Sequence, residues 1–492
     1  MSRIRYAPGG AALSISIALV SLLASSLAAT DARASGLDAA PLIGTGQSSP
    51  TTRDAAAIYW NPAQLAFLTR TELLLGAGVI IGNIQYERER RGTYQTPDTL
   101  QYRLPLRPEN VDPTKTGTAE EVSSTPVAPT GNAFLAVPVI DNRLVVGGGI
   151  YVPYAAALNF PLEGAQAWQM QQALIASFNV TLGAGVRAMD NLAFGAGVSY
   201  VGGTASIRKL QDFGSLQEFA NGLASPAIGQ ANDFGPNAPP EMRELDVLSR
   251  PFSLTNAFSH GITFNAGVAY QPTRAINLAL TYQHGTKMHY NGDFALDMSD
   301  EFFTQDLAAQ GLQYKPLVEG EAELSFWLPK RITLGASYDA TPKIRVDGFV
   351  SYVTYSDVDA FVVETRSPDL AQPELGIGDT VTVTLPRDWN DTVWVEANGR
   401  YRLNEDMLVS VGVGYQSPAS PESTIDAASP DGHRIIGALG GSYAVSERIS
   451  LYGDARLQGI LPREVTESTN DLGNGTYRLF IASVVGHIKA VF

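Results

Sequence analysis

Long stretches of the chain alternate between apolar and polar residues with a period of two. From Leu174 to Arg187, for example, apolar residues occupy the even positions and small or polar residues the odd ones. The same pattern returns in four later stretches, which begin at Ile276, Ile332, Val393 and Ile449. Because neighbouring side chains on a strand point to opposite faces, the pattern predicts strands with one apolar and one polar face. Such alternation over about ten residues favours a transmembrane β-barrel over a soluble sandwich, whose strands usually have about five or six residues.

The connections between these stretches alternate between short and long. The six short ones are Asp141-Asn142, Met189–Asn191, Pro272–Arg274, Thr341-Pro342, Asn404–Asp406 and Ser446-Glu447. The seven long ones lie at about 87–129, 156–172, 209–255, 288–322, 357–380, 417–432 and 460–476. Outer-membrane barrels have short periplasmic turns, long outer loops and an even number of antiparallel strands. Residues 71–492 are therefore predicted to form an all-β, fourteen-stranded antiparallel barrel.

The last alternating stretch ends on the C-terminal residue, Phe492. A final strand that ends on an aromatic residue is typically recognised by the barrel-assembly machinery of Gram-negative bacteria. This machinery is a predicted partner, and the outer membrane is the predicted location.

The first 34 residues have the pattern of a signal peptide. Arg3 and Arg5 precede an uncharged apolar stretch from Ala11 to Ala29, and Ala32-Arg33-Ala34 offers a small-x-small cleavage site. An uncleaved membrane anchor is the alternative, because the apolar stretch is nearly long enough to span a bilayer.

Residues 35–70 lack strand alternation and come before the first predicted strand. A barrel of fourteen strands has a lumen that is too wide for side chains alone to fill. We therefore expect this segment to form a plug, called a hatch, inside the lumen. The alternative is that Asn61-Pro62 only starts a turn before the first strand.

Composition narrows the chemistry. The chain has no Cys, only 17% charged residues and a formal net charge of −15, so we expect no thiolate site and no nucleic-acid partner. Asp297, Asp300 and Glu301 form an acidic group, but such a group is usually a solvated loop, so no metal and no cofactor are predicted. Asp300–Gln310 has helical character, with Phe302, Phe303 and Leu307 on one side, which suits a lid over an apolar pocket.

Several motifs together resemble one family. They are Asp54 with Asn61-Pro62-Ala63, Leu328-Pro329-Lys330, Gly335, Tyr352–Asp359, Leu385–Thr392, Tyr401, Gly412–Tyr415, Ser417-Pro418, Pro430–Arg434 and Tyr477–Phe492. In these residues the chain resembles the FadL-type outer-membrane transporters of long-chain fatty acids and other hydrophobic compounds.

The resemblance implies a gated channel. An amphiphile would bind near the extracellular loops and pass to a site inside the barrel. A movement of the hatch, with Asp54, Asn61, Pro62 and Ala63 as its gating residues, would then open an internal path.

The resemblance also implies a sideways exit where the third strand is kinked. This chain has Gly147-Gly148-Gly149 followed by Pro153 in that strand, and proline cannot donate a hydrogen bond to a ladder. Pro153, Tyr154 and Ala155 are the predicted kink, and an ordinary bulge is the alternative.

The predicted function is the uptake of long-chain fatty acids or related hydrophobic compounds, without enzymatic activity. Candidate ligand-binding residues are Trp60, Phe302, Phe303 and Lys330. The expected partners are the hydrophobic ligand, outer-membrane lipid and lipopolysaccharide, and the protein is expected to be a monomer. A barrel of another class, such as an enzyme, an adhesin or a polar-solute porin, is the alternative. The sequence does not identify the compound.

Overall fold

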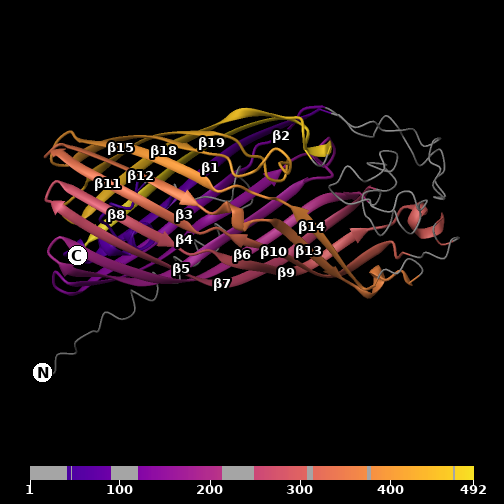
Figure 1. Ribbon diagram of the computed structural model, residues 1–492, viewed down its shortest axis with the longest axis horizontal. Coiled ribbons are helices and arrows are strands. Elements are labelled where there is room, and N and C mark those ends of the chain that lie inside the picture. Colours follow the sequence, from indigo (N-terminus) through magenta and orange to yellow (C-terminus); the bar gives the residue numbers. More distant parts are fainter. Residues whose placement is uncertain are drawn as a thin grey trace, which may run out of the picture.

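The computed structural model describes residues 42–45, 47–89, 120–212, 249–306, 308, 314–373, 378–468 and 471–492. The predicted signal peptide lies outside the described residues. The described strands form a closed antiparallel barrel of fourteen strands, as the alternation predicted. Closure is direct, because β1 (Glu72–Arg88) pairs along its whole length with β19 (Gly475–Val491). The strands tilt across the long axis of the molecule (Figure 1).

Nineteen ladder segments make up the fourteen barrel strands, because five strands contain a break. In chain order the remaining strands are β2 (Val122–Ser124) with β3 (Val127–Ile140), β4 (Leu144–Asn159), β5 (Gln172–Met189), β6 (Leu192–Asp212), β7 (Ser249–Thr273), β8 (Ile276–Gln283) with β9 (Thr286–Asp297), β10 (Leu317–Leu328) with β11 (Arg331–Thr341), β12 (Ile344–Val353) with β13 (Ala360–Arg366), β14 (Thr380–Pro386) with β15 (Thr392–Arg402), β16 (Met407–Gln416), β17 (Arg434–Ala444) and β18 (Ile449–Val465).

Helices are short in the described part of the chain. They are α2 (Ala57–Trp60), η2 (Pro62–Phe67), η9 (Phe302–Asp306), η11 (Tyr355–Asp357), η12 (Pro368–Leu370) and η14 (Asp471–Gly473). None of these helices is long and apolar enough to cross a membrane.

The predicted inward and outward faces are confirmed. On β5, Leu182 is 71% exposed on the outside, whereas its neighbour Thr181 is fully buried. Arg187, Arg345, Arg400 and Arg456 carry their charges into the lumen, as the alternation predicts, whereas Arg402, for which it predicts the same face, is exposed at the end of β15. This placement avoids the cost of about 2–4 kcal/mol for a charge on the lipid face near the middle of the membrane.

The strands beside the long loops extend further than the sequence pattern indicated. The expected loop at 288–322 contains most of β9 and the first half of β10, and the expected loop at 357–380 contains all of β13. The outward residues there, among them Glu319, Glu321 and Glu364, are exposed and charged. Pairing continues beyond the lipid-facing band, but the apolar face that marks a strand in the sequence does not.

A buried ion pair joins two barrel strands across the lumen. Arg456 of β18 donates from Nη1 to Glu396 Oε2 at 2.9 Å and from Nη2 to Glu396 Oε1 at 3.0 Å. Both side chains are only 1% exposed. Two parallel bonds between a guanidinium and a carboxylate hold both groups in a fixed geometry.

We expect Glu396→Gln to lower the free energy of unfolding by about 3–5 kcal/mol, because it leaves the Arg456 charge buried without its carboxylate. Urea unfolding of the reconstituted barrel measures this difference. Glu405→Gln, in an exposed turn, is the matched control and should change the value by no more than about 0.5 kcal/mol. Equal free energies of unfolding for the two variants would show that the Arg456–Glu396 pair does not stabilise the wall.

Candidate functional site

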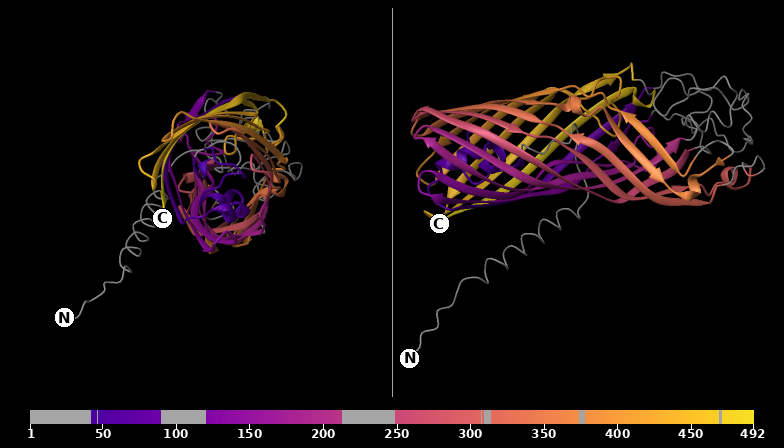
Figure 2. Two further views of the ribbon diagram at one scale, coloured as in Figure 1. Left: turned by 90° about the vertical axis from the view of Figure 1, so that its left-hand side faces the viewer. Right: turned by 60° about the horizontal axis from the view of Figure 1, so that its bottom comes forward.

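The N-terminal segment, residues 42–70, occupies the barrel lumen. Figure 2 shows this indigo part of the chain inside the ring of strands when the barrel is viewed from the end with the tight turns. All residues from 47 to 68 are buried except Arg53, which is exposed, and Phe67, which is half-buried. The segment packs closely on the wall, with α2 against β4 and β5, and η2 against β4 to β7.

Asn61 connects the two helices of this segment to the wall. Its Oδ1 accepts a hydrogen bond from Ala63 N at 3.0 Å, which caps η2, and its Nδ2 donates to Val268 O of β7 at 3.1 Å. Pro62 takes the first position of η2, where no N–H is needed. A Cβ at Gly267 would lie 2.1 Å from Asn61 Oδ1, so this approach requires glycine in the wall.

Asp54 has a local role at the start of α2. Its Oδ1 accepts from Ala56 N at 2.9 Å, and its side chain is buried. Asp54, Asn61, Pro62 and Ala63, the predicted gating residues, therefore lie together in one folded unit within the lumen.

Three carbonyl groups at the end of α2 accept hydrogen bonds from wall side chains. Asn265 Nδ2 donates to Ile58 O at 2.7 Å, Gln283 Nε2 to Tyr59 O at 2.8 Å, and Thr281 Oγ1 to Trp60 O at 2.9 Å. The alternation places Thr281 and Gln283 on the inner face, but nothing in the sequence indicates which groups they bind.

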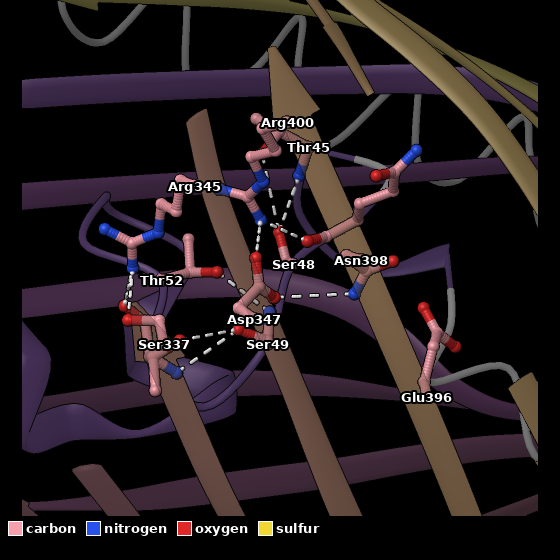
Figure 3. Close-up of polar contacts among 12 residues, drawn as sticks. Thr45, Ser48, Ser49, Thr52, Ser337, Arg345, Asp347, Glu396, Asn398 and Arg400 are labelled. Atoms are coloured by element: carbon pink, nitrogen blue, oxygen red, sulfur yellow. Dashed lines mark hydrogen bonds and ion pairs between the residues drawn. The ribbon is translucent and has the colours of Figure 1, made fainter. Parts of the chain in front are cut away.

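Two wall arginines hold the first part of the segment (Figure 3). Arg400 Nη2 donates to Gln47 O at 2.6 Å and also pairs with Asp347 at 3.4 Å. Arg345 Nη2 donates to Thr51 O at 3.3 Å. The segment is thus attached to β12 and β15 as well as to β7 and β8.

Trp60 lies in an aromatic cluster rather than in an open cavity. Its ring lies 5.7 Å from that of Phe349 and 6.1 Å from that of Trp394, centroid to centroid. Its Nε1 donates to Ile43 O at 2.8 Å. In the described residues, this predicted ligand-binding side chain therefore contacts the N-terminal segment and the wall.

An apolar cavity of about 170 Å³ lies inside the barrel. Its lining comes from strands far apart in the sequence and includes Ala156, Leu254, Phe294, Leu324, Val363 and Val383. A cavity with mostly aliphatic and aromatic walls and a few polar groups is typical of a small-molecule site. Because its residues come from many strands, no single sequence motif marks it.

The charged residues in the lining of the cavity are Lys209, Arg387 and Asp426, and the last two form an ion pair. Arg387 Nη1 donates to Asp426 Oδ2 at 2.9 Å, and the two side chains are 2% and 6% exposed. The Arg387 guanidinium lies 4.7 Å from the centre of the Phe361 ring. Among the described residues, buried Arg387 Nε has no hydrogen-bond partner.

Phe302 and Phe303 are fully buried in the long connection after β9. Their rings are perpendicular, and Phe303 packs on Tyr314, whose pKa is raised to about 12 by burial. They share a hydrophobic cluster with cavity-lining residues such as Phe294 but do not line the cavity themselves. Leu307, predicted to be on the same helix face, lies outside the described residues.

Lys330 binds within the wall. Its Nζ lies 2.9 Å from both carboxylate oxygens of Asp357. This contact connects the short segment between β10 and β11 to η11. The structure places Lys330 away from the lining of the apolar cavity.

The wall is interrupted at Pro153 of β4. Pairing with β3 stops at Asn132↔Tyr151, and the register with β5 shifts by one residue between Tyr151 and Tyr154. Beyond this bulge, Asn159 N donates to Ser124 Oγ at 2.8 Å in place of a backbone partner. Ala155 lines the apolar cavity on the inner side of this interruption.

In the described ranges, no three His, Asp or Glu side chains are grouped so that they could hold a metal ion.

Known proteins match this chain over about half of its length in sequence and over nearly all of its length in structure. The chain is 21% identical to the long-chain fatty acid transport protein of Shigella flexneri over 280 residues, which cover 49% of this chain and 59% of that protein. The structure of a FadL homologue from Pseudomonas aeruginosa matches with a TM-score of 0.71 at 17% identity, covering 94% of this chain and 99% of that one. The Ralstonia pickettii toluene transporter TbuX matches with a TM-score of 0.60 at 16% identity, covering 93% and 99%.

The family described as "Outer membrane protein transport protein (OMPP1/FadL/TodX)" matches residues 16–483. This match includes the N-terminal segment and nearly all of the barrel. The chain belongs to this family of outer-membrane transport proteins.

Proposed function

We propose that this outer-membrane protein takes up long-chain fatty acids or related amphiphiles through a gated internal path. The observation that carries the proposal is the apolar cavity inside the barrel, lined by strand residues and by residues of the extracellular connections. Its neighbours in sequence and structure are channels for hydrophobic compounds, not enzymes. The cavity is the ligand site, the N-terminal segment is the hatch, and the interruption at Pro153 is the exit.

The lining of the cavity suits an apolar chain with one polar end. Each buried CH₂ group of a ligand contributes about 0.8 kcal/mol, which the aliphatic walls supply without any specific contact. Arg387 supplies a positive charge in the lining for the polar end, while Asp426 balances most of this charge. The name of one relative includes long-chain fatty acid and that of a structural neighbour includes toluene, so both ligand classes need a test.

The hatch, residues 35–70 in this proposal, closes the lumen below the cavity. Hydrogen bonds from separate wall side chains to its backbone carbonyls hold it, among them those from Arg400, Asn265 and Gln283. A single bond of this kind contributes about 1 kcal/mol. Such bonds can be exchanged in turn when a ligand fills the cavity, so the hatch can shift without the barrel unfolding.

The exit at β4 avoids returning the ligand to water. An apolar chain that leaves the cavity toward the periplasm would lose the hydrophobic free energy gained by binding. Past Pro153 the ladder to β3 is absent among the described residues, and small alanine side chains follow. This part of the wall therefore offers a route from the cavity to the bilayer.

Deletion of residues 35–63 is expected to leave a folded barrel and to raise ion conductance in planar bilayers. The barrel strands keep all their ladder pairs in this variant, whereas the lumen loses its filling. A difference in gel mobility between heated and unheated samples shows that the variant barrel is folded. Conductance equal to that of the intact protein would contradict the hatch assignment.

Ala155→Trp should slow the uptake of radiolabelled oleate into cells, because the indole ring would fill the route beside Pro153. Ala184→Trp, on the lipid face of neighbouring β5, is the matched control and should leave uptake unchanged. Binding of oleate by the purified variant separates an exit defect from a binding defect. If Ala155→Trp and its control take up oleate equally fast, the ligand leaves elsewhere.

The double variant Arg387→Met, Asp426→Asn tests the ligand class without leaving a buried charge unpaired. We expect the affinity for oleate to fall roughly 10- to 100-fold, because a hydrogen bond to a charged group is worth about 1.5–3 kcal/mol. The affinity for toluene, which has no charged group, should not change. Isothermal titration calorimetry in detergent measures both, and equal losses for the two compounds would contradict the role of Arg387.

A further inference from the structure

The barrel wall has a second interruption, between β7 and the strand made of β8 and β9. Residue pairing runs from Thr273↔Ile276 to Asn265↔Gln283 and resumes only at Phe258↔Asn291. The stretch between, residues 259–264 of β7 opposite 284–290, is fully described and lies in the wall. β7 stays fully paired with β6 on its other side across this stretch.

One backbone bond remains at the near end of this stretch, from His284 N to Phe264 O at 2.9 Å, and side chains supply two further bonds between the strands. Thr263 Oγ1 donates to His284 O at 2.6 Å, and Ser259 Oγ accepts from His289 N at 2.8 Å. A membrane barrel normally satisfies its backbone groups by strand pairing, because lipid offers no partners. The hydrogen bonds of these two hydroxyl groups take the place of backbone pairing and keep the wall closed. Rotation about a single side-chain bond is enough to break either of them.

A small cavity of about 30 Å³ connects the lumen to this interruption. Its lining includes Tyr59 of the N-terminal segment, Pro153 and Tyr154 of β4, and Phe264 and His284 at the interruption. Phe264 is 45% exposed and belongs to the outer face of β7. The cavity therefore reaches from the segment in the lumen to side chains on the outside of the barrel, and it has room for about one water.

Tyr59 joins the two strands at the point where their ladder ends. Its carbonyl oxygen accepts from Gln283 Nε2 at 2.8 Å and from Asn265 Nδ2 at 3.4 Å. Asn265 and Gln283 are the last paired residues before the interruption. The N-terminal segment is thus bonded to both sides of the interruption, and a shift of Tyr59 would remove this bridge.

We propose that the interruption between β7 and β8–β9 is a second side opening, released by movement of Tyr59, which passes amphiphiles with a polar head group. This inference rests on the proposed function, since it requires a hydrophobic compound in the lumen. It differs from the exit at Pro153 in the strands that border it, although Pro153 and Tyr154 also line the small cavity behind it.

The lining favours an amphiphile over a hydrocarbon. Side-chain amides and hydroxyls of Asn179, Ser199, Thr263 and Gln283 line the inner part of the cavity. At the outer end the Phe264 and His284 rings stack at 4.7 Å, and the Tyr282 hydroxyl and His284 Nδ1 are 2.7 Å apart. Rings with a polar edge are typical of the membrane–water interface. A polar head group can exchange hydrogen bonds along this lining, whereas toluene would leave its polar groups unpaired.

A disulfide across the interruption provides the test. A Cβ at Gly261 would lie 3.0 Å from Thr286 Oγ1 and 3.7 Å from Thr286 Cγ2, so the two Cβ atoms lie within disulfide reach. The chain has no cysteine, so the pair Gly261→Cys, Thr286→Cys is the only one that can form. The pair Val268→Cys, Leu280→Cys joins directly opposite residues of the same strands where the ladder is intact, and is the matched control.

Oleate uptake by cells carrying the oxidised Gly261→Cys, Thr286→Cys protein should fall several-fold and recover on reduction, while toluene uptake stays unchanged. The control pair should change neither. Gly261→Leu, which fills the interruption without an oxidation step, should lower oleate uptake in the same way. Hydrogen exchange should show that residues 259–264 lose protection when Tyr59 is shifted by deletion of residues 35–63.

Normal oleate uptake by the oxidised pair and by Gly261→Leu would overturn the second opening. Absence of oleate and toluene uptake by the unmodified protein would instead overturn the proposed function, so the two failures are distinguishable.

Discussion

A wall that crosses a membrane must satisfy its own backbone N–H and C=O groups, because lipid supplies no hydrogen-bond partner. Closure between β1 and β19 meets this requirement around the barrel. Most other features depend on where the ladder is complete and where it is not. Among other breaks, it lacks pairs beside Pro153 and between β7 and the junction of β8 with β9, and at both of these places the lumen behind it contains the N-terminal segment or a cavity. At these two interruptions other protein groups can replace the missing partners.

The same requirement explains how the lumen is filled. Inward Arg, Asn, Gln and Thr side chains satisfy the carbonyl groups of the N-terminal segment, and the segment in turn occupies a lumen too wide for side chains alone. These contacts are many, polar and individually weak. The Arg456–Glu396 pair is of a different kind, since it joins wall strand to wall strand and is not part of the attachment of the segment. The wall is thus stabilised by contacts that do not involve the N-terminal segment, and a movable plug requires such a wall.

The sequence predicted the barrel well because two local signals agree. Alternation defines the faces of strands such as β5, and tight turns such as Asp141-Asn142 separate them. The capping role of Asn61 and the position of Pro62 also follow from local chemistry. The first half of β10 and all of β13 escaped prediction, because their outer faces carry solvated charges such as Glu321 instead of lipid-facing apolar residues.

The cavity was less accessible to sequence reasoning. Trp60, Phe302 and Phe303 are large aromatic residues in suggestive places, yet they pack within the protein rather than around the cavity. Cavity-lining residues such as Leu254 and Val383 look like any other inward residue of a strand. The pairing of Arg387 with Asp426 joins two distant loops, and only the closed barrel brings them together.

The central claim is that the space inside the barrel holds a hydrophobic molecule above a segment that closes the lumen. Native mass spectrometry of the protein, purified from the outer membrane and released from detergent in the gas phase, tests it most directly. We expect a retained adduct with the mass of a fatty acid or another apolar compound, and we expect it to be lost when Leu324→Arg places a charge in the cavity. A protein that carries no such adduct after incubation with oleate or toluene, or one whose adduct is unaffected by Leu324→Arg, would contradict it.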